Sequence, residues 1–292
     1  MNNKYFLTID VGTKNLAMCL CEYNENLNMK NILEKINIIS WEILDVSYKP
    51  LYCKQIKNKR AICNCISKFY CLKENTTNHN DCNNLIGYCK THIKKIREYN
   101  KEKINKNKKI KFYNINLNPI YKNNFSTQME KLLTTLELFF IKKIISPYNY
   151  INGKLIKISN LNIYIENQPV YKNPNMKSIS VGIYIFFCMK KILYSKFISS
   201  INYINATVKT KPDFIIQLNN LIGLNSKIKN FKLYTNRKNF SEDIISKVIP
   251  KLTYNFKYLN NITSISNYII TKKKDDLADT LLYQIYIIIY LL

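Results

Sequence analysis

Four acidic residues stand where they could bind metal ions and support metal-dependent chemistry. Asp10 ends the first apolar run of the chain and leads into a glycine turn, and Glu166 ends another apolar run. Asp276 and Asp279 are three residues apart, about one helical turn, so they would share a helix face. An acid at the end of a buried strand is costly unless a cation or a hydrogen-bond network needs it there. These residue types at these positions indicate a metal site.

The chemistry depends on whether the four acids converge. The carboxyl ends of parallel strands lie on one edge of a sheet, and a helix that begins at that edge would bring its two acids up to the strand ends. Converging carboxylates repel one another, and hard cations relieve the repulsion. Mg²⁺ (or Mn²⁺) accepts such ligands, and a pair of these ions suits phosphodiester hydrolysis. Asp275 is ambiguous, because a helix N-cap or first-turn acid explains it as well as a ligand does.

The apolar pattern predicts the elements that must position these acids. We expect an α/β fold, a mixed sheet built of a three-stranded antiparallel meander plus parallel strands and flanked by helices. Three strands are predicted within residues 4–45, and two more at residues 161–166 and 203–208. Helices are predicted at residues 126–145, 175–198, 240–251 and 274–292. Ser241 would be the N-cap of the third helix, and residues 209–240 read as a basic segment of low periodicity.

The charge of the chain indicates a polyanionic partner. Among 292 residues there are 45 Lys and Arg against 19 Asp and Glu, a formal net charge of +26. Such an excess favours nucleic acid or an anionic membrane surface. The last apolar run, residues 280–292, contains Gln284 and is too short to span a bilayer, so we expect a buried helix and no membrane partner. The lack of a secretory signal pattern indicates an intracellular protein.

A cluster of cysteines interrupts the apolar pattern. We expect residues 47–115 to form a Cys/His-rich basic insertion in a core made of residues 1–46 and 116–292. The Cys89-x-x-His92 spacing lets two side chains reach one ion from a single turn. A tetrahedral zinc site of Cys53, Cys63, Cys89 and His92 is the preferred reading, with Cys65 competing for the place of Cys63. Cys71 and Cys82 would be spare or belong to a second site, and a set of free cysteines is the alternative.

Three motifs carry a resemblance to a known family. Ile9-Asp-Val-Gly-Thr-Lys-Asn15, Ile165-Glu-Asn-Gln-Pro169 and Lys273-Lys-Asp-Asp-Leu-Ala-Asp279 resemble motifs of the Holliday junction resolvases of large DNA viruses. This is the poxvirus-type branch of the RuvC superfamily, and the resemblance covers residues 4–45 and 124–292. It implies an RNase H-like fold and metal-dependent cleavage of four-way DNA junctions by paired symmetrical nicks. The catalytic acids would be Asp10, Glu166, Asp276 and Asp279.

The resemblance also implies partners and DNA contacts. The partners would be branched double-stranded DNA and a second copy of the chain in a homodimer. Gln168 would touch the DNA backbone, and Arg237 and Lys238 would bind phosphates, although a solvated basic loop explains the last two equally well. The helix at residues 175–198 is a candidate dimer surface because its apolar positions run nearly all round, which a buried core helix would also explain. A viral protein of this kind would act in the host cytoplasm or the virion.

Other functions remain open at this point. Asp10-Val-Gly-Thr13 also resembles the first phosphate loop of actin-like and sugar-kinase folds, but the five glycines of the chain form no cluster that could supply the further loops. Another RNase H-like nuclease, such as a transposase or an RNA–DNA hybrid nuclease, has the same acids. A non-catalytic DNA-binding relative is the third alternative.

Overall fold

The computed structural model divides the chain into two compact units, Met1–Ser47 with Met129–Leu292, and Tyr48–Gln128. The described residues of the first unit are 3–25, 32–47, 129–146, 150–151, 154–155, 158–169, 171, 173–223, 234–253, 266, 268–271 and 274–292. Those of the second are 53, 56–57, 61–63, 65, 67, 69–72, 85–95, 118–119 and 125–128. The insertion was predicted to span residues 47–115. The second compact unit of the structure spans residues 48–128.

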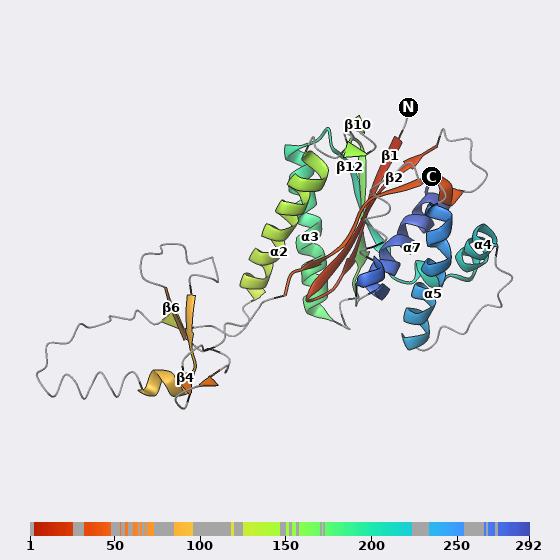
Figure 1. Ribbon diagram of the computed structural model, residues 1–292. Helices are drawn as coiled ribbons and strands as arrows, with labels where there is room; N and C mark the ends of the chain where they lie inside the picture. The colour runs from red at the N-terminus through yellow and green to blue at the C-terminus, as the bar shows by residue number, and fades with distance from the viewer. Residues whose placement is uncertain are drawn as a thin grey trace, which may run out of the picture. The chain divides into compact units, whose positions relative to one another are not determined.

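A five-stranded mixed sheet forms the centre of the first unit (Figure 1). Its order is β12-β11-β1-β2-β3. β1, β2 and β3 pair antiparallel, whereas β11 pairs parallel with β1, and β12 parallel with β11. The strands are β1 Asn3–Val11, β2 Asn15–Asn24, β3 Ile36–Asp45, β11 Leu161–Asn167 and β12 Ile198–Asn205. The predicted mixed α/β sheet with its antiparallel meander is therefore confirmed.

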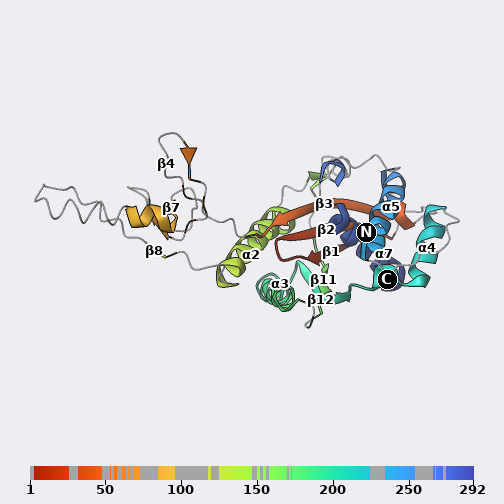
Figure 2. The ribbon, with the colours of Figure 1, turned by 90° about the horizontal axis from the view of Figure 1, so that it is seen from below.

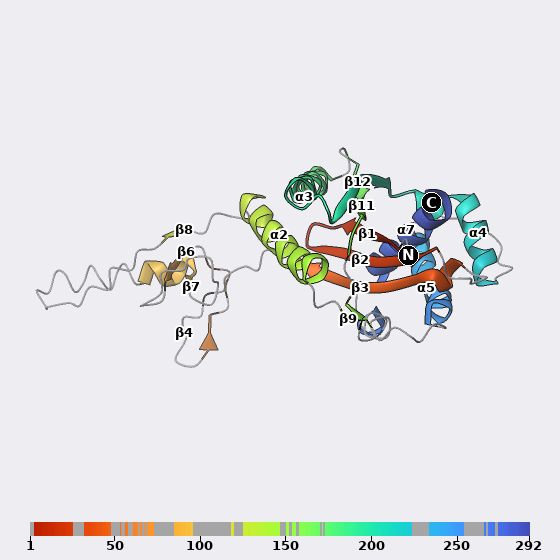
Figure 3. The same cartoon turned by 90° about the horizontal axis from the view of Figure 1, so that it is seen from above.

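Helices cover both faces of this sheet (Figures 2 and 3). On one face lie α2 (Phe125–Phe139), which continues as the π-helical η4 (Phe140–Ile145), and α3 (Pro174–Leu193). On the other lie α4 (Pro212–Ile222), α5 (Tyr234–Thr253) and α7 (Lys274–Tyr290). Each face buries its own apolar cluster, because alternate residues of the strands point to opposite sides.

Short elements complete the two units. In the first unit these are η1 Ile32–Lys35, η5 Val208–Thr210, β9 Tyr150–Ile151 and β10 Lys154–Leu155. In the second unit they are β4 Ile56–Lys57, β5 Ala61–Ile62, β6 Phe69–Leu72, β7 Leu85–Tyr88, β8 Asn118–Pro119 and a helical turn at residues 90–95. No helix among the described residues is long and apolar enough to cross a membrane.

The turn between β1 and β2 requires its glycine. The Gly12 amide donates to the Asn15 carbonyl oxygen at 3.1 Å. A Cβ atom at position 12 would lie 2.6 Å from that same oxygen, which is closer than a Cβ can come. Gly12 is thus explained by a tight hairpin turn, without a phosphate loop.

Several predicted boundaries are wrong. The helix predicted at 175–198 ends at Leu193, and the following strand begins at Ile198 instead of residue 203. The segment 209–240 contains α4, and α5 begins at Tyr234, so Ser241 lies inside that helix and is not its N-cap. The turn at residues 194–197 holds neither glycine nor proline, so no residue type marked where the helix ends and the strand begins.

Helix α7 packs on β1 in a register that polar side chains define. The Thr8 hydroxyl donates to the Thr280 carbonyl oxygen at 2.9 Å. The Gln284 amide donates to the carbonyl oxygens of Phe6 at 3.1 Å and Cys19 at 2.8 Å. Four residues of helix rise about 6 Å and two residues of strand about 6.7 Å, so helix and strand stay in step as they run in opposite directions.

A second clamp holds the same helix from β3. The Trp41 indole N–H donates to the Leu277 carbonyl oxygen at 3.0 Å and lies 3.2 Å from the Thr280 hydroxyl oxygen. The Trp41 ring stacks on Tyr268 with centroids 4.6 Å apart. Most of α7 is buried, as its apolar run predicted.

We expect Gln284→Ala to destabilise the first unit by about 2–4 kcal/mol, because it removes two buried hydrogen bonds and leaves a cavity. Urea unfolding would measure the change. Gln217→Ala is the matched control, since Gln217 is an exposed helical glutamine of α4 and its loss should change stability by less than about 0.5 kcal/mol. Equal effects of the two substitutions would contradict the register described above.

Candidate functional site

The structure brings the two strand-end acids together at one edge of the sheet. Ile9 of β1 is paired with Ile165 of β11 in parallel register, so Asp10 and Glu166 follow side by side. Their carboxyl groups lie within hydrogen-bonding reach of each other. Glu166 is 7% exposed. This is the arrangement that the sequence predicted for the ends of two parallel strands.

Helix α7 supplies the other two acids to the same place. Thr8 and Asp10 lie on the same face of β1, and Thr8 bonds the backbone of Thr280. One more helical turn toward the start of α7 reaches Asp276, whose charge acts on Asp10. Asp279 also lies close enough to Asp10 for the charge of Asp10 to raise the pKa of Asp279. All four predicted acids therefore converge on one edge of the sheet.

Lys209, in the short helix η5, places a cation among these acids. Its ammonium forms an ion pair with Asp279, and the two side chains are 13% and 20% exposed. It also lies 5.0 Å from the centre of the Tyr283 ring. Burial alone would lower the pKa of Lys209, but the charges of Asp279, Asp10 and Glu166 together raise it. The ammonium is therefore held in its charged form by the acids around it.

The acids of this site are buried close to one another, and a cation would relieve both the burial cost and the repulsion of their ionised forms. Burial, with the charge and hydrogen bond of Glu166, holds the pKa of Asp10 well above its usual range. Burial raises the pKa of Asp279 to about 6, against the opposing effect of Lys209. Because the folded protein holds these protons more tightly than the unfolded chain, the contribution of Asp279 to stability falls as pH rises from 3.8 to about 6. Four ionised carboxylates here need more positive charge than Lys209 supplies.

Neighbouring polar groups hold Glu166 in place. The Gln168 amide donates to the Glu166 carboxylate at 2.9 Å and to the Val11 carbonyl oxygen at 3.2 Å. The Ser180 hydroxyl donates to the backbone carbonyl oxygen of Glu166 at 3.1 Å. Gln168 is 8% exposed, so its observed position suits the orientation of Glu166, whereas the predicted DNA contact needs an open side chain.

The structure does not assign the other three candidate residues, Asp275, Arg237 and Lys238, to the acidic site. The charge of Asp275 acts on Tyr268, whose pKa burial and nearby acids raise to about 12, so the structure places Asp275 on the Tyr268 side of α7. Arg237 and Lys238 belong to the first turns of α5. Their side chains are outside the described residues, and their phosphate-binding role stays a prediction.

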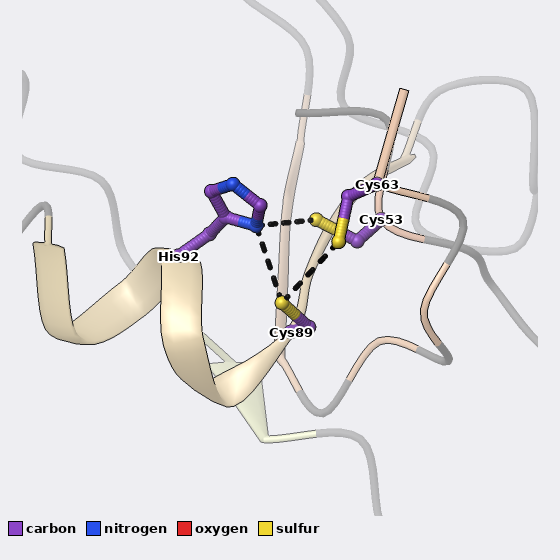
Figure 4. Close-up of side chains that lie close together, drawn as sticks. All are labelled: Cys53, Cys63, Cys89 and His92. Carbon is purple, nitrogen blue, oxygen red and sulfur yellow. Dashed lines mark hydrogen bonds between the residues drawn. The ribbon is translucent and has the colours of Figure 1, made fainter. Parts of the chain in front are cut away.

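A second cluster, in the other unit, contains the four predicted zinc ligands (Figure 4). One ligand atom from each of Cys53, Cys63, Cys89 and His92 lies within 4.8 Å of all the others. His92 Nδ1 is 3.2 Å from Cys89 Sγ and 3.5 Å from Cys53 Sγ. Cys63 Sγ and Cys89 Sγ are 3.8 Å apart, far longer than a disulfide bond. The cluster could hold a metal ion.

The backbone around this cluster favours thiolates. The Cys65 backbone N–H bonds the Cys63 sulfur and lowers the pKa of that thiol. Burial opposes ionisation of Cys89, but the His92 backbone N–H and ring lower its pKa overall. Cys65 itself is exposed and its carbonyl oxygen accepts from the Cys53 N–H at 2.8 Å, so it supports the turn while Cys63 takes the ligand position. The Cys71 side chain and all of Cys82 are outside the described residues.

The sequence interpretation missed Lys209, Ser241 and Tyr283. Lys209 was read as part of a basic segment, although it closely follows a strand that ends at the acidic edge. The Ser241 hydroxyl donates to the Asp279 carboxylate at 2.7 Å from inside α5. Tyr283 is fully buried and stands one helical turn after Asp279. The spacing of Asp276, Asp279 and Tyr283 on one helix face was the available signal.

Lys209→Gln should destabilise the metal-free protein by about 3 kcal/mol at pH 8, because it leaves the buried Asp279 carboxylate without its cation. The loss should be smaller at pH 5, where Asp279 takes up a proton. Thermal unfolding at the two pH values measures this. Lys247→Gln is the control, since its i,i+4 pair with Asp243 is exposed and worth about 0.5 kcal/mol or less. A pH-independent loss would contradict this electrostatic account.

Comparison with known proteins gives one informative match. No family model matches the chain, and no solved structure matches it significantly. An uncharacterized protein of Acanthamoeba polyphaga mimivirus is 26% identical over 321 aligned positions. The match covers 94% of this chain and 72% of that protein. The chain is thus similar over nearly its whole length to a protein of a giant virus.

Proposed function

We propose that the protein is a metal-dependent, structure-selective DNA endonuclease that resolves four-way junctions by paired nicks. The observation that carries the proposal is the convergence of Asp10, Glu166, Asp276 and Asp279 at one edge of the sheet. The mixed sheet, with an antiparallel meander followed by parallel strands, is the sheet expected of the RNase H-like fold. The three motifs that resemble viral junction resolvases contain these same four acids.

The donor groups of the acidic site fit Mg²⁺ or Mn²⁺. The four residues offer carboxylate oxygens, which are the ligands that hard divalent cations prefer. Burial, and after it the charge of neighbouring acids, raises the pKa of Asp10 and of Asp279. A divalent cation would therefore be bound with a gain in electrostatic energy. When bound, such ions would activate water and stabilise the leaving oxygen of a phosphodiester.

The chain's own residues prepare this site. Gln168 and Ser180 fix the orientation of Glu166, and Ser241 with Lys209 fixes that of Asp279. The buried Lys209 ammonium would offset part of the negative charge of the acids. The net charge of +26 would draw the polyanion to the protein, with an affinity that falls as salt rises.

We also propose that the second cluster binds a structural zinc ion. A tetrahedral ion with Zn–S bonds of about 2.3 Å and Zn–N bonds of about 2.0–2.1 Å separates two sulfurs by about 3.8 Å and a sulfur from a nitrogen by about 3.6 Å. The observed separations are 3.8 Å between sulfurs and 3.2 and 3.5 Å between sulfur and nitrogen. Three thiolates and one imidazole are a donor set typical of structural zinc.

The mimivirus relative supports a viral setting for this activity. A resolvase of this kind would act on viral DNA, either in the host cytoplasm or in the virion. Branched double-stranded DNA is accordingly the proposed substrate.

Cleavage of a synthetic four-way junction tests the proposed function. With Mg²⁺ or Mn²⁺, we expect paired nicks in the junction and little cutting of a matched linear duplex or RNA–DNA hybrid. Asp10→Asn should reduce the rate by at least about 1,000-fold, because the site would lose one of the carboxylates that would hold the divalent cations. The metal-free variant should unfold at a temperature no lower than the wild type, since it has lost a repelling charge. Glu130→Gln, an exposed substitution on α2, is the control.

Two results would overturn this proposal. Equal or faster cutting of the hybrid would favour a different RNase H-like nuclease. Junction binding without cutting under any divalent cation would favour a non-catalytic DNA-binding protein.

Zinc content tests the second site. Protein purified without chelator should hold about one equivalent of zinc, and Cys89→Ser should lose most of it because three donors bind far more weakly than four. Cys188→Ser is the matched control, since Cys188 lies on α3 in the other unit. Less than about half an equivalent in the wild type, unchanged by Cys89→Ser, would remove the zinc assignment.

A further inference from the structure

The phenol of Tyr283 lies among the acids at the edge of the sheet. Tyr283 is 0% exposed and stands on α7 one helical turn after Asp279. The centre of its ring is 5.0 Å from the Lys209 ammonium. Burial raises the pKa of Tyr283 well above its usual range, and the charges of Glu166, Asp10 and Asp279 raise it further. The hydroxyl therefore faces the acidic site from inside the protein.

This hydroxyl has no hydrogen-bond partner among the described residues. Neighbouring hydroxyls are paired, since Thr280 donates to the Leu277 carbonyl oxygen at 2.7 Å and Ser241 to the Asp279 carboxylate at 2.7 Å. A buried polar group without a partner is costly, and such groups are rare in folded proteins. A phenylalanine would give the ring the same apolar packing without that cost. The packing of the ring therefore does not explain the hydroxyl.

The donors around the acids are unevenly shared. Ionised carboxylates only accept hydrogen bonds, so their orientation depends on the donors that surround them. Both carboxylate oxygens of Asp279 accept from a side chain, one from Ser241 and the other from Lys209. Gln168 donates to one oxygen of Glu166, Oε2. The Glu166 carboxylate can accept further donors, and the Tyr283 hydroxyl is near enough to interact with it.

The place of the Tyr283 hydroxyl is fixed by the elements around it. The bonds that tie Thr280 and Gln284 to the sheet hold α7 on both sides of this residue. The Glu166 side chain, with its longer rotatable stem, is the one of the two that can adjust. Because the hydroxyl is already dehydrated in the folded protein, a bond to Glu166 would form without a further desolvation cost.

We propose that Tyr283 is a positioning residue whose hydroxyl donates to the Glu166 carboxylate when a divalent cation binds. The bond would fix which oxygen Glu166 presents to the ion. Neighbouring donors commonly hold metal-binding carboxylates in this way, and their loss typically costs about 10–100-fold in metal affinity. The inference rests on the proposed divalent-cation site, and it assigns a role there to a residue that need contact neither the ion nor DNA.

Calorimetric titration of the full-length protein with Mn²⁺ tests this role. Tyr283→Phe should weaken Mn²⁺ binding about 10–100-fold, because Glu166 loses a donor while the ring keeps its packing. Without added divalent cation, the variant should unfold at the same temperature as the wild type or a higher one, since it has lost an unpartnered buried hydroxyl. A merely structural role predicts the reverse, a lower unfolding temperature with unchanged Mn²⁺ affinity.

Tyr5→Phe is the matched control. The Tyr5 hydroxyl is buried toward the other end of β1, where it donates to the Glu22 carboxylate at 3.1 Å. Its loss should lower the unfolding temperature and leave the Mn²⁺ affinity unchanged. The comparison separates the loss of any buried phenol hydroxyl beside a glutamate from the loss of the one at the acidic site.

Unchanged Mn²⁺ affinity in Tyr283→Phe would overturn the inference, and so would a wild type that binds no Mn²⁺. The titration is independent of catalysis. Weaker binding by the variant of a protein that cuts no DNA would therefore support the inference and refute the proposed nuclease alone. If both proposals hold, the Mg²⁺ concentration that gives half-maximal cleavage of the junction should rise by the same factor as the Mn²⁺ dissociation constant.

Discussion

The packing of α7 against β1 is the contact on which the acidic site depends. Apolar burial alone would hold this helix on the sheet without fixing how far along it the helix sits. Thr8 and Gln284 remove that freedom, because each makes a hydrogen bond that a shift of one residue would break. Leaving such buried groups unpaired would cost about 1–3 kcal/mol each. The polar bonds therefore turn a non-directional apolar contact into a defined register.

That register also explains why the acids lie at the end of the contact. Two steps of four helical residues match two steps of two strand residues, from Gln284 beside Phe6 to Thr280 beside Thr8 and then to Asp276 near Asp10. The same geometry gathers the negative charges of the four acids at a buried place, where solvent screens them poorly. Burial and the neighbouring charges both raise the pKa of Asp10 and of Asp279, so the folded protein holds these two carboxylates at a cost when they are ionised.

The parts of this structure that sequence reasoning reached are those with a strong local signal. Short stretches of sequence were enough to predict three features: the strand-end acids, the metal-ligand spacing of Cys89 and His92, and the buried helix α7. Helix α4 also had such signals, Pro212 at its start and Gly223 in a left-handed conformation at its end, but its basic surroundings concealed them. Lys209 and Ser241 had none, because their roles come from contacts with Asp279 across 70 and 38 residues of chain.

The two candidate metal sites use the same physical device in different structural settings. Each site gathers ionisable groups whose charged forms repel one another or are costly to bury, and a bound cation would stabilise those charged forms. The acids lie on strands and a helix that large apolar clusters already hold together, so their arrangement does not depend on a bound ion. Among the described residues of their unit, Cys53 and Cys89 are buried together with Ser67, Tyr88 and Ile93, whereas Cys63 and His92 are half-buried. Few apolar side chains are buried among the residues described in the second unit, so the binding energy of a cation there would contribute directly to folding. In the first unit the apolar clusters already hold the acids, and under the proposed function a cation would serve the chemistry instead.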